Sequence, residues 1–79
     1  MNDDFSRQLG DKLRIARLNH GLTLAQVEER SGGRWTSERL GHYECGRRPI
    51  KAETFLELAA FYRVRPKTLL PGADLGLQY

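Results

Sequence analysis

The chain has 79 residues, of which 39% are hydrophobic and 29% are charged, and its formal net charge is +3. A chain of this length can close one modest core and has no room for a separate catalytic domain. Its only cysteine, Cys45, excludes an internal disulfide, no Cys/His set has metal-ligand spacing, and no segment approaches the ~18 apolar residues of a membrane span. We therefore expect a cytoplasmic protein that is not an enzyme and has no cofactor, no metal and no membrane contact.

The first predicted helix covers about residues 4–20. Phe5, Leu9, Leu13 and Ala16 recur at spacings of four, four and three residues, which places them on one apolar stripe. Gly21 follows as a residue that can end the helix. The stripe predicts that this helix buries one face against the core.

A second helix is predicted to begin at Leu24. Residues 23–26, Thr-Leu-Ala-Gln, match a capping box, in which the threonine oxygen accepts from the glutamine backbone and the glutamine side chain reaches back. The helical pattern ends at the Ser-Gly-Gly of residues 31–33. No Gly-Lys-Ser/Thr follows these glycines and no strand precedes them, so they predict a turn and not a phosphate-gripping loop.

The third predicted helix covers about residues 36–45. Thr36 can cap its first turn, and Gly46 can end it in a left-handed conformation. Leu40 and Tyr43 share its inward face, with Trp35 just before it as a further core residue. The opposite face is the candidate surface for reading base pairs, and its residues are small or able to form hydrogen bonds: Ser37, Glu38, Arg39, Gly41 and His42.

The excess positive charge lies in the stretch that surrounds this helix. Residues 30–51 carry six basic and two acidic residues, whereas residues 1–29 carry four and five, and residues 52–79 carry three of each. Arg47, Arg48 and Lys51 form a basic arm, which is expected to be extended because Pro49 disfavours helical geometry at the preceding residue. A basic arm of this kind favours contact with phosphate groups and hence a nucleic-acid partner.

Two more helices are predicted after the arm. One begins near Ala52 and carries an apolar stripe that includes Leu58 and Tyr62, and the other runs from Pro66 through Leu70. No segment alternates apolar and polar residues long enough to predict a strand. The expected fold is an all-α, five-helix domain over residues 1–72, followed by a flexible tail or linker over residues 73–79.

Two helices joined by a glycine turn, the second with a basic exit, are the parts of a helix-turn-helix. On these features the sequence resembles the Cro/C1-type, or XRE-type, helix-turn-helix family. The matching segments are HGLTLAQVEE (20–29), LGHYECG (40–46), the Arg-Arg-Pro arm (47–49) and FLELAAFYRV (55–64) followed by RPKTLLPG (65–72). The resemblance implies a lambda-repressor-like bundle that binds double-stranded DNA and regulates transcription, most simply as a repressor at the bacterial nucleoid.

The family pattern also implies a role for each matching residue. The outward face of the third helix would meet base edges, with Arg39 able to reach either bases or backbone. The pattern pairs Arg17 with Glu44, which gives both residues a structural role. The phosphate contacts that it implies are Thr23, Arg34, Thr36, Arg47, Arg48 and Lys51. One reading helix buries too little surface for tight recognition, so we expect a homodimer on a two-fold symmetric operator.

Within the family the sequence is most similar to the BldD-type regulators of actinobacteria. It shares with them the Val-Glu-Glu-x-Ser of residues 27–31, the Gly-Arg-Trp of residues 33–35 and the Tyr-Glu-x-Gly of residues 43–46. It departs from most family members in Leu24, Glu28 and a longer turn before the third helix. Regulators of this type bind a cyclic dinucleotide through arginine–aspartate motifs in a second domain. No such motif occurs here, so we expect no small-molecule effector for this chain.

Two alternatives remain open. The same fold can serve as a protein-interaction module, such as an antitoxin-like or adaptor domain, although the concentrated positive charge argues against it. The length and layout also suit a small stand-alone repressor or a restriction-system controller.

Overall fold

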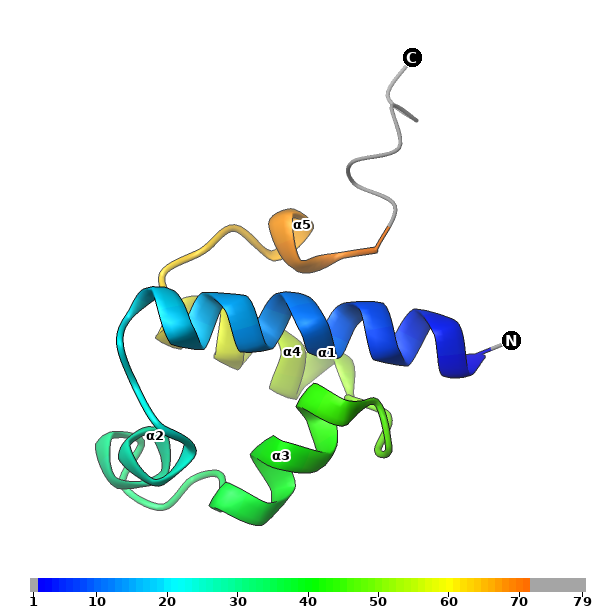
Figure 1. Cartoon of the computed structure of the whole chain (residues 1–79). Coiled ribbons are helices and arrows are strands. Elements are labelled where there is room, and N and C mark those ends of the chain that lie inside the picture. The colour runs from blue at the N-terminus through cyan, green and yellow to red at the C-terminus, as the bar shows by residue number, and fades with distance from the viewer. Residues whose placement is uncertain (1, 72–79) are drawn as a thin grey trace.

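The computed structural model describes residues 2–71, with side-chain burial from residue 4, and this part of the chain forms five helices (Figure 1). They are α1 (Asn2–Asn19), α2 (Leu24–Arg30), α3 (Ser37–Cys45), α4 (Ala52–Phe61) and α5 (Pro66–Leu69). No strand occurs within residues 2–71, so the predicted all-α, five-helix fold is confirmed. The predicted tail over residues 73–79 lies outside the described residues.

Helix α1 runs through the middle of the molecule and separates α5 from the α2–α3 unit (Figure 1). It packs against α3 on one side and α5 on the other, while α2 packs against α3 and α4 packs against α5. The α2–α3 unit therefore stands at one end of the fold, where an approaching macromolecule can reach it.

The core takes residues from every helix, and a helix with one apolar stripe is stable only when that stripe is covered. Most of the α1 stripe is buried, but the prediction for its first residue is wrong, because the Phe5 side chain is 48% exposed. The N-terminal end of α1 projects beyond the other helices (Figure 1), which agrees with the exposure of this residue. The buried apolar residues are Leu9, Leu13, Ala16, Leu22, Val27, Trp35, Leu40, Tyr43, Leu58, Ala59, Tyr62 and Leu69.

Trp35 belongs to this core, as predicted, and not to the binding surface. Its side chain is buried and lies edge-on to Phe61, with ring centroids 5.6 Å apart and an interplanar angle of 86°. Phe61 in turn meets Tyr62 edge-on at 5.4 Å. This aromatic contact fastens the end of the α2–α3 turn to α4.

The backbones of α1 and α3 approach closely where Gly10 faces the end of α3. A Cβ atom added at Gly10 would lie 2.5 Å from the carbonyl oxygen of Glu44, a separation that real Cβ atoms do not show. Gly46, just after α3, would meet the backbone of Arg7 at 2.9 Å in the same way. Two glycines thus let α1 hold the C-terminal end of α3.

Candidate nucleic-acid interface

Both ends of α3 are defined by local hydrogen bonds. Thr36 has an extended backbone, and its hydroxyl oxygen accepts from the Arg39 backbone N–H at 3.1 Å. Gly46 has a φ of 77°, and its left-handed conformation lets the Arg47 N–H donate to the His42 carbonyl oxygen at 2.9 Å. These bonds satisfy backbone groups that a helix end leaves unpaired. The basic arm therefore starts directly where α3 stops.

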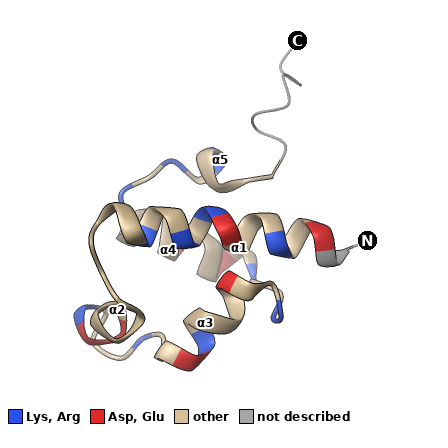
Figure 2. Cartoon of the chain, viewed as in Figure 1, with Lys and Arg blue, Asp and Glu red and all other residues tan. Residues whose placement is uncertain are grey.

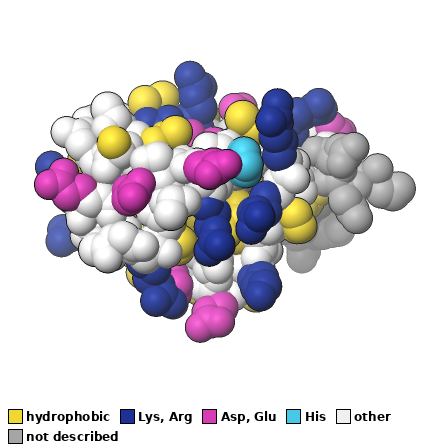
Figure 3. All heavy atoms as spheres, turned by 90° about the horizontal axis from the view of Figure 1, so that it is seen from below, with side chains coloured by type: hydrophobic (Ala, Val, Ile, Leu, Met, Phe, Trp, Pro, Cys, Tyr) yellow, Lys and Arg dark blue, Asp and Glu magenta, His cyan; other side chains and the backbone are white. Residues whose placement is uncertain are grey.

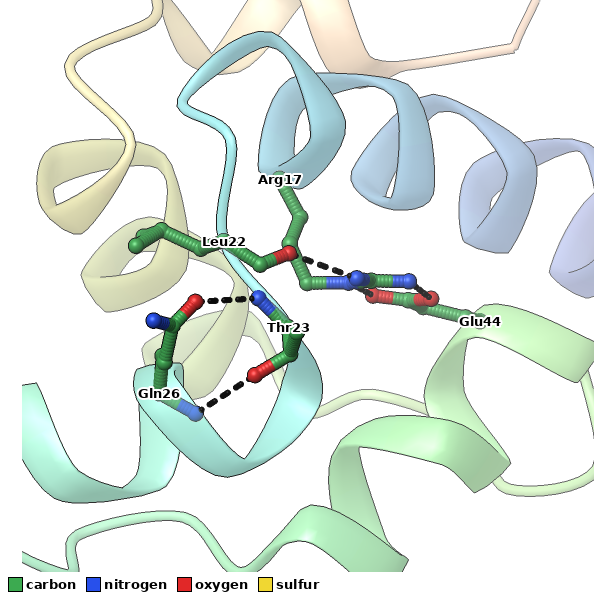
Figure 4. Close-up of polar contacts among 5 residues, drawn as sticks. All are labelled: Arg17, Leu22, Thr23, Gln26 and Glu44. Carbon is green, nitrogen blue, oxygen red and sulfur yellow. Dashed lines mark hydrogen bonds and ion pairs between the residues drawn. The ribbon is translucent and has the colours of Figure 1, made fainter.

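Helix α2 begins with the predicted capping box (Figure 4). The Thr23 backbone N–H donates to the Gln26 side-chain oxygen at 2.9 Å, and the Gln26 backbone N–H donates to the Thr23 hydroxyl oxygen at 3.1 Å. The reciprocal bonds fix the first turn of α2 and leave Thr23 exposed.

An ion pair joins α1 to the end of α3 (Figure 4). Arg17 donates to both carboxylate oxygens of Glu44, at 2.8 and 2.9 Å, and also to the Leu22 carbonyl oxygen at 2.8 Å. The hydrogen bonds from Arg17 to Glu44 raise the pKa of the Arg17 guanidinium. The Arg17 side chain thus links three parts of the fold, which are α1, the segment that precedes α2, and the end of α3.

A second carboxylate holds the other end of α3. Glu28 of α2 accepts from both the backbone N–H and the hydroxyl of Ser37, each at 2.8 Å. These hydrogen bonds, the one from the backbone N–H first, lower the pKa of the Glu28 carboxyl. The Ser37 hydroxyl therefore has a protein partner in the absence of DNA.

Arg34, in the turn before α3, pairs with Glu57 of α4. Its guanidinium donates to both carboxylate oxygens, at 2.6 and 2.9 Å, and the pair is largely exposed. Hydrogen bonding to Glu57 raises the pKa of Arg34. The structure thus places Arg34 against α4, apart from the arm residues with which the sequence analysis had grouped it.

Two adjoining hollows lie along the outward side of α3 and the arm. The larger, of roughly 750 Å³, is lined by four cationic residues, Arg39, Arg47, Arg48 and Lys51, together with His42 and residues of the arm. The smaller, of roughly 170 Å³, is lined by Thr36, Glu38, Arg39, His42 and Arg48. Figure 3 shows this face of the molecule, where Lys and Arg side chains gather around a histidine, and Figure 2 shows the alternation of charge along α3.

The four cations of the larger hollow differ from Arg17 and Arg34. Arg17 and Arg34 each have a carboxylate partner, whereas Arg39, Arg47, Arg48 and Lys51 have no side-chain partner within the described part of the chain. Unpaired cations that converge on one concave surface attract an anionic ligand.

The remaining predicted residues of α3 and its cap differ in exposure and in what they face. Glu38 and Thr36 are exposed on the outward side, and His42 is half-buried between the two hollows. Gly41 is half-buried and faces α2, since a Cβ added there would meet Leu24 at 3.7 Å. Gly41 therefore lies where α3 crosses α2, beside the outward side of α3.

Sequence reasoning did not assign a contact to several residues of this region. Glu28 and Glu57 hold Ser37 and Arg34, and Thr54 of α4 lines the larger hollow. The departure from the family pattern at Glu28, noted in the sequence, was the one available signal. Nothing local in the sequence indicates which arginine Glu57 meets.

No group of three or more His, Cys, Asp or Glu side chains that could hold a metal ion occurs among the described residues. Within residues 2–71 no helix is long and apolar enough to cross a membrane.

Known proteins resemble this chain closely. A family model described as a helix-turn-helix domain matches residues 8–71. The crystal structure of the DNA-binding domain of BldD is 45% identical, with a TM-score of 0.86, over 90% of this chain and 100% of that chain. The structure of the S. venezulae BldD DNA-binding domain is 46% identical, with a TM-score of 0.83, over 86% of this chain and 99% of that chain. No curated protein sequence matches the chain.

Proposed function

The chain belongs to the helix-turn-helix domain family, and from that membership we propose that it is a sequence-specific regulator of transcription that binds double-stranded DNA. The family resemblance predicted from the sequence is thereby confirmed. One observation supports the proposal most directly. Four cations without protein partners converge on a hollow beside the outward face of α3.

In the proposed complex α3 enters the major groove and the basic arm meets the flanking phosphates. Arg47, Arg48 and Lys51 are exposed and follow the helix end, so they can reach the DNA backbone while α3 lies among the bases. These contacts release counterions and supply affinity for any duplex. Thr23 and Thr36, at the starts of α2 and α3, are proposed to meet phosphates on the opposite flank.

The base contacts come from the outward side of α3. Glu38 can accept a hydrogen bond from a cytosine amino group, and Arg39 can donate two hydrogen bonds to a guanine. His42 lies between the two hollows and can donate to either a base or a phosphate. We propose that Ser37 and Gly41 complete this surface by allowing close approach of the groove.

Arg34 differs from the arm residues because a carboxylate already holds its side chain. It was predicted to contact phosphate, but its guanidinium is held by Glu57. An exposed ion pair is worth little, so a nearby phosphate can replace the carboxylate at small cost. We propose that Arg34 contributes to DNA binding only through this exchange.

Tight binding is proposed to require two copies of the chain on a two-fold symmetric operator, because one recognition helix buries too little surface alone. Such a complex would act at the nucleoid of a bacterial cytoplasm and block transcription as a repressor. No small-molecule effector is proposed for this chain.

Selection from a pool of random duplexes tests the proposal. The chain should enrich one motif whose half-sites are inverted and lie about one helical turn apart, roughly 34–36 Å between centres. Sedimentation of the chain with the enriched duplex should give two chains per duplex. A pool that stays unenriched would contradict sequence-specific binding and would favour a protein partner for the same surface.

A further inference from the structure

The turn between α2 and α3 has two adjacent glycines, held by hydrogen bonds from the Gly32 N–H to the Glu29 carbonyl oxygen and from the Gly33 N–H to the Glu28 carbonyl oxygen. It covers residues 31–36, and Gly32 and Gly33 have φ angles of 69° and 80°, with open space around both. Glycine has more conformational freedom than any other residue, so a turn with two adjacent glycines allows many directions of the next helix. Contacts between α2 and the start of α3 can therefore add to what the turn itself fixes.

Glu28 provides such a contact from α2. One of its carboxylate oxygens, Oε1, accepts from the Ser37 backbone N–H and from the Ser37 hydroxyl, each at 2.8 Å. The backbone N–H belongs to the first residue of α3 and has no partner within the helix. A negative charge at this end of a helix is also favoured by the helix dipole. The contact thus joins α2 to the first turn of α3 through a charged acceptor.

The two ends of α3 are held in different ways. The C-terminal end is fixed against α1 by the Arg17–Glu44 pair and by the close approach at Gly10. The N-terminal end is held by Glu28, by the packing of Trp35 just before it and, through the turn, by the Arg34–Glu57 pair. Loss of Glu28 would leave one end anchored and allow the other to shift.

This arrangement deepens the proposed function and rests on it: we propose that Glu28 is a positioning residue for sequence recognition, and that Ser37 is its tether and does not read a base. Residues near the start of a recognition helix contact base edges. A shift of the N-terminal end of α3 therefore disturbs base contacts. The phosphate contacts of the arm lie beyond the other, anchored end of α3, so the same shift leaves them in place. The role assigned to Ser37 on the reading surface is therefore revised.

Removal of Glu28 should change the sequence preference of the chain without weakening its sequence-independent affinity for DNA. The preference for the selected operator over a scrambled duplex should fall on the order of tenfold, which is the effect of one mismatched base pair. Affinity for the scrambled duplex should stay the same or rise, because a negative charge near the DNA is lost. A purely structural residue would lower both affinities together.

The experiment uses the full chain and five variants: Glu28→Ala, Glu28→Gln, Ser37→Ala, the double variant Glu28→Ala/Ser37→Ala, and Glu29→Ala. Glu29 is the matched control, since it is exposed on the same helix and its side chain has no partner among the described residues. Glu28→Gln keeps an oxygen that can accept from Ser37 while removing the charge. Each variant is titrated with the operator selected by the parent chain and with its scrambled duplex.

The coupling between Glu28 and Ser37 is the decisive readout. We expect Glu28→Ala and Ser37→Ala each to lower the preference about tenfold, and the double variant to lose no more than the larger single loss. Glu29→Ala should keep the parent's preference, and Glu28→Gln should restore most of it. Circular dichroism checks that every variant is folded, and should Glu28→Ala fail this check, Ser37→Ala and Glu28→Gln carry the test.

Two results would overturn the inference while leaving the proposed function intact. One is a Glu28→Ala variant whose operator preference equals that of the parent. The other is losses that multiply, to about a hundredfold in the double variant, because Ser37 would then contact a base independently of Glu28. A parent chain that binds both duplexes equally would instead overturn the proposed function, and this inference with it.

Discussion

Arg17 and Glu44 lie 27 positions apart in the sequence and form a bidentate ion pair, with hydrogen bonds of 2.8 and 2.9 Å. Both side chains are largely buried, at 11% and 8% exposure. The pair connects α1 to the last turn of α3, so the helix proposed to read DNA is anchored in the core by a charged contact. An anchor of this kind costs free energy to desolvate and destabilises the fold strongly when only one partner is removed.

The first prediction follows from that asymmetry. Glu44→Ala should lower the free energy of unfolding by about 3–5 kcal/mol, because it leaves the Arg17 charge buried without its carboxylate. Asp4→Ala is the matched control, since it breaks the Arg7–Asp4 pair, whose side chains are 67% and 69% exposed. Urea denaturation of both variants measures the difference. Equal, small losses in the two variants would show that the buried pair contributes no more than a surface pair.

A second prediction concerns Gly10 and Gly41, both inside helices. Alanine is favoured over glycine in a helix by about 1 kcal/mol, so Gly41→Ala should be neutral or stabilising, with its Cβ in ordinary contact 3.7 Å from Leu24. Gly10→Ala should be destabilising despite the same propensity, because its Cβ would overlap the backbone carbonyl groups at the end of α3. Thermal unfolding of the two variants compares them directly. A stabilised Gly10→Ala would contradict the close approach of α1 and α3.

A third prediction uses the phenol of Tyr62. Burial raises the pKa of Tyr62 from 10.0 to about 12, so the folded chain keeps a proton that the unfolded chain releases at lower pH. Its contribution to stability is therefore complete below pH 10 and is lost as the pH rises toward 12. The loss should amount to about 2–3 kcal/mol in the parent and be absent in Tyr62→Phe.

The measurement for Tyr62 is the difference in unfolding free energy between parent and variant across this pH range. Other groups that titrate there are common to both chains, so the difference isolates Tyr62. A difference that stays constant between pH 9 and pH 12 would show that the phenol is not held in its neutral form by burial.

The sequence predicted those features of the fold that depend on neighbouring residues. The Thr23 capping box, the Thr36 cap and the Gly46 terminator each follow from groups a few positions apart, and the structure has all three. Periodicity also predicted the buried part of α1. It was wrong for Phe5, because a repeat in one helix does not say where the neighbouring helices end.

Contacts between distant residues were not predictable in the same way. Glu28 and Ser37 are 9 positions apart, and Arg34 and Glu57 are 23 apart, so local pattern gives no reason to join them. The outward face of the third predicted helix placed Ser37 on a binding surface, and the family resemblance implied a phosphate contact for Arg34. The structure shows that each already has a carboxylate partner, which changes what each can do for a ligand.

In the proposed complex the arm supplies affinity for any duplex, while the outward face of α3 supplies sequence preference. Three single variants separate these roles: Lys51→Ala in the arm, Glu38→Ala on α3, and Lys67→Ala as a control for lost charge. Lys67 is exposed on α5, on the other side of α1 from α3 (Figure 1). All three residues are exposed, so none of the substitutions disturbs the core.

The most direct measurement is the affinity of each variant for the selected operator and for its scrambled duplex, across a series of salt concentrations. Lys51→Ala should reduce the slope of log affinity against log salt by about one unit on both duplexes and keep the preference between them. Glu38→Ala should keep the slope and lower the preference by about 1–3 kcal/mol at one or two base pairs. Lys67→Ala should match the parent. If Lys51→Ala and Glu38→Ala also match the parent on both duplexes, the account of α3 and its arm as a DNA-reading surface is contradicted.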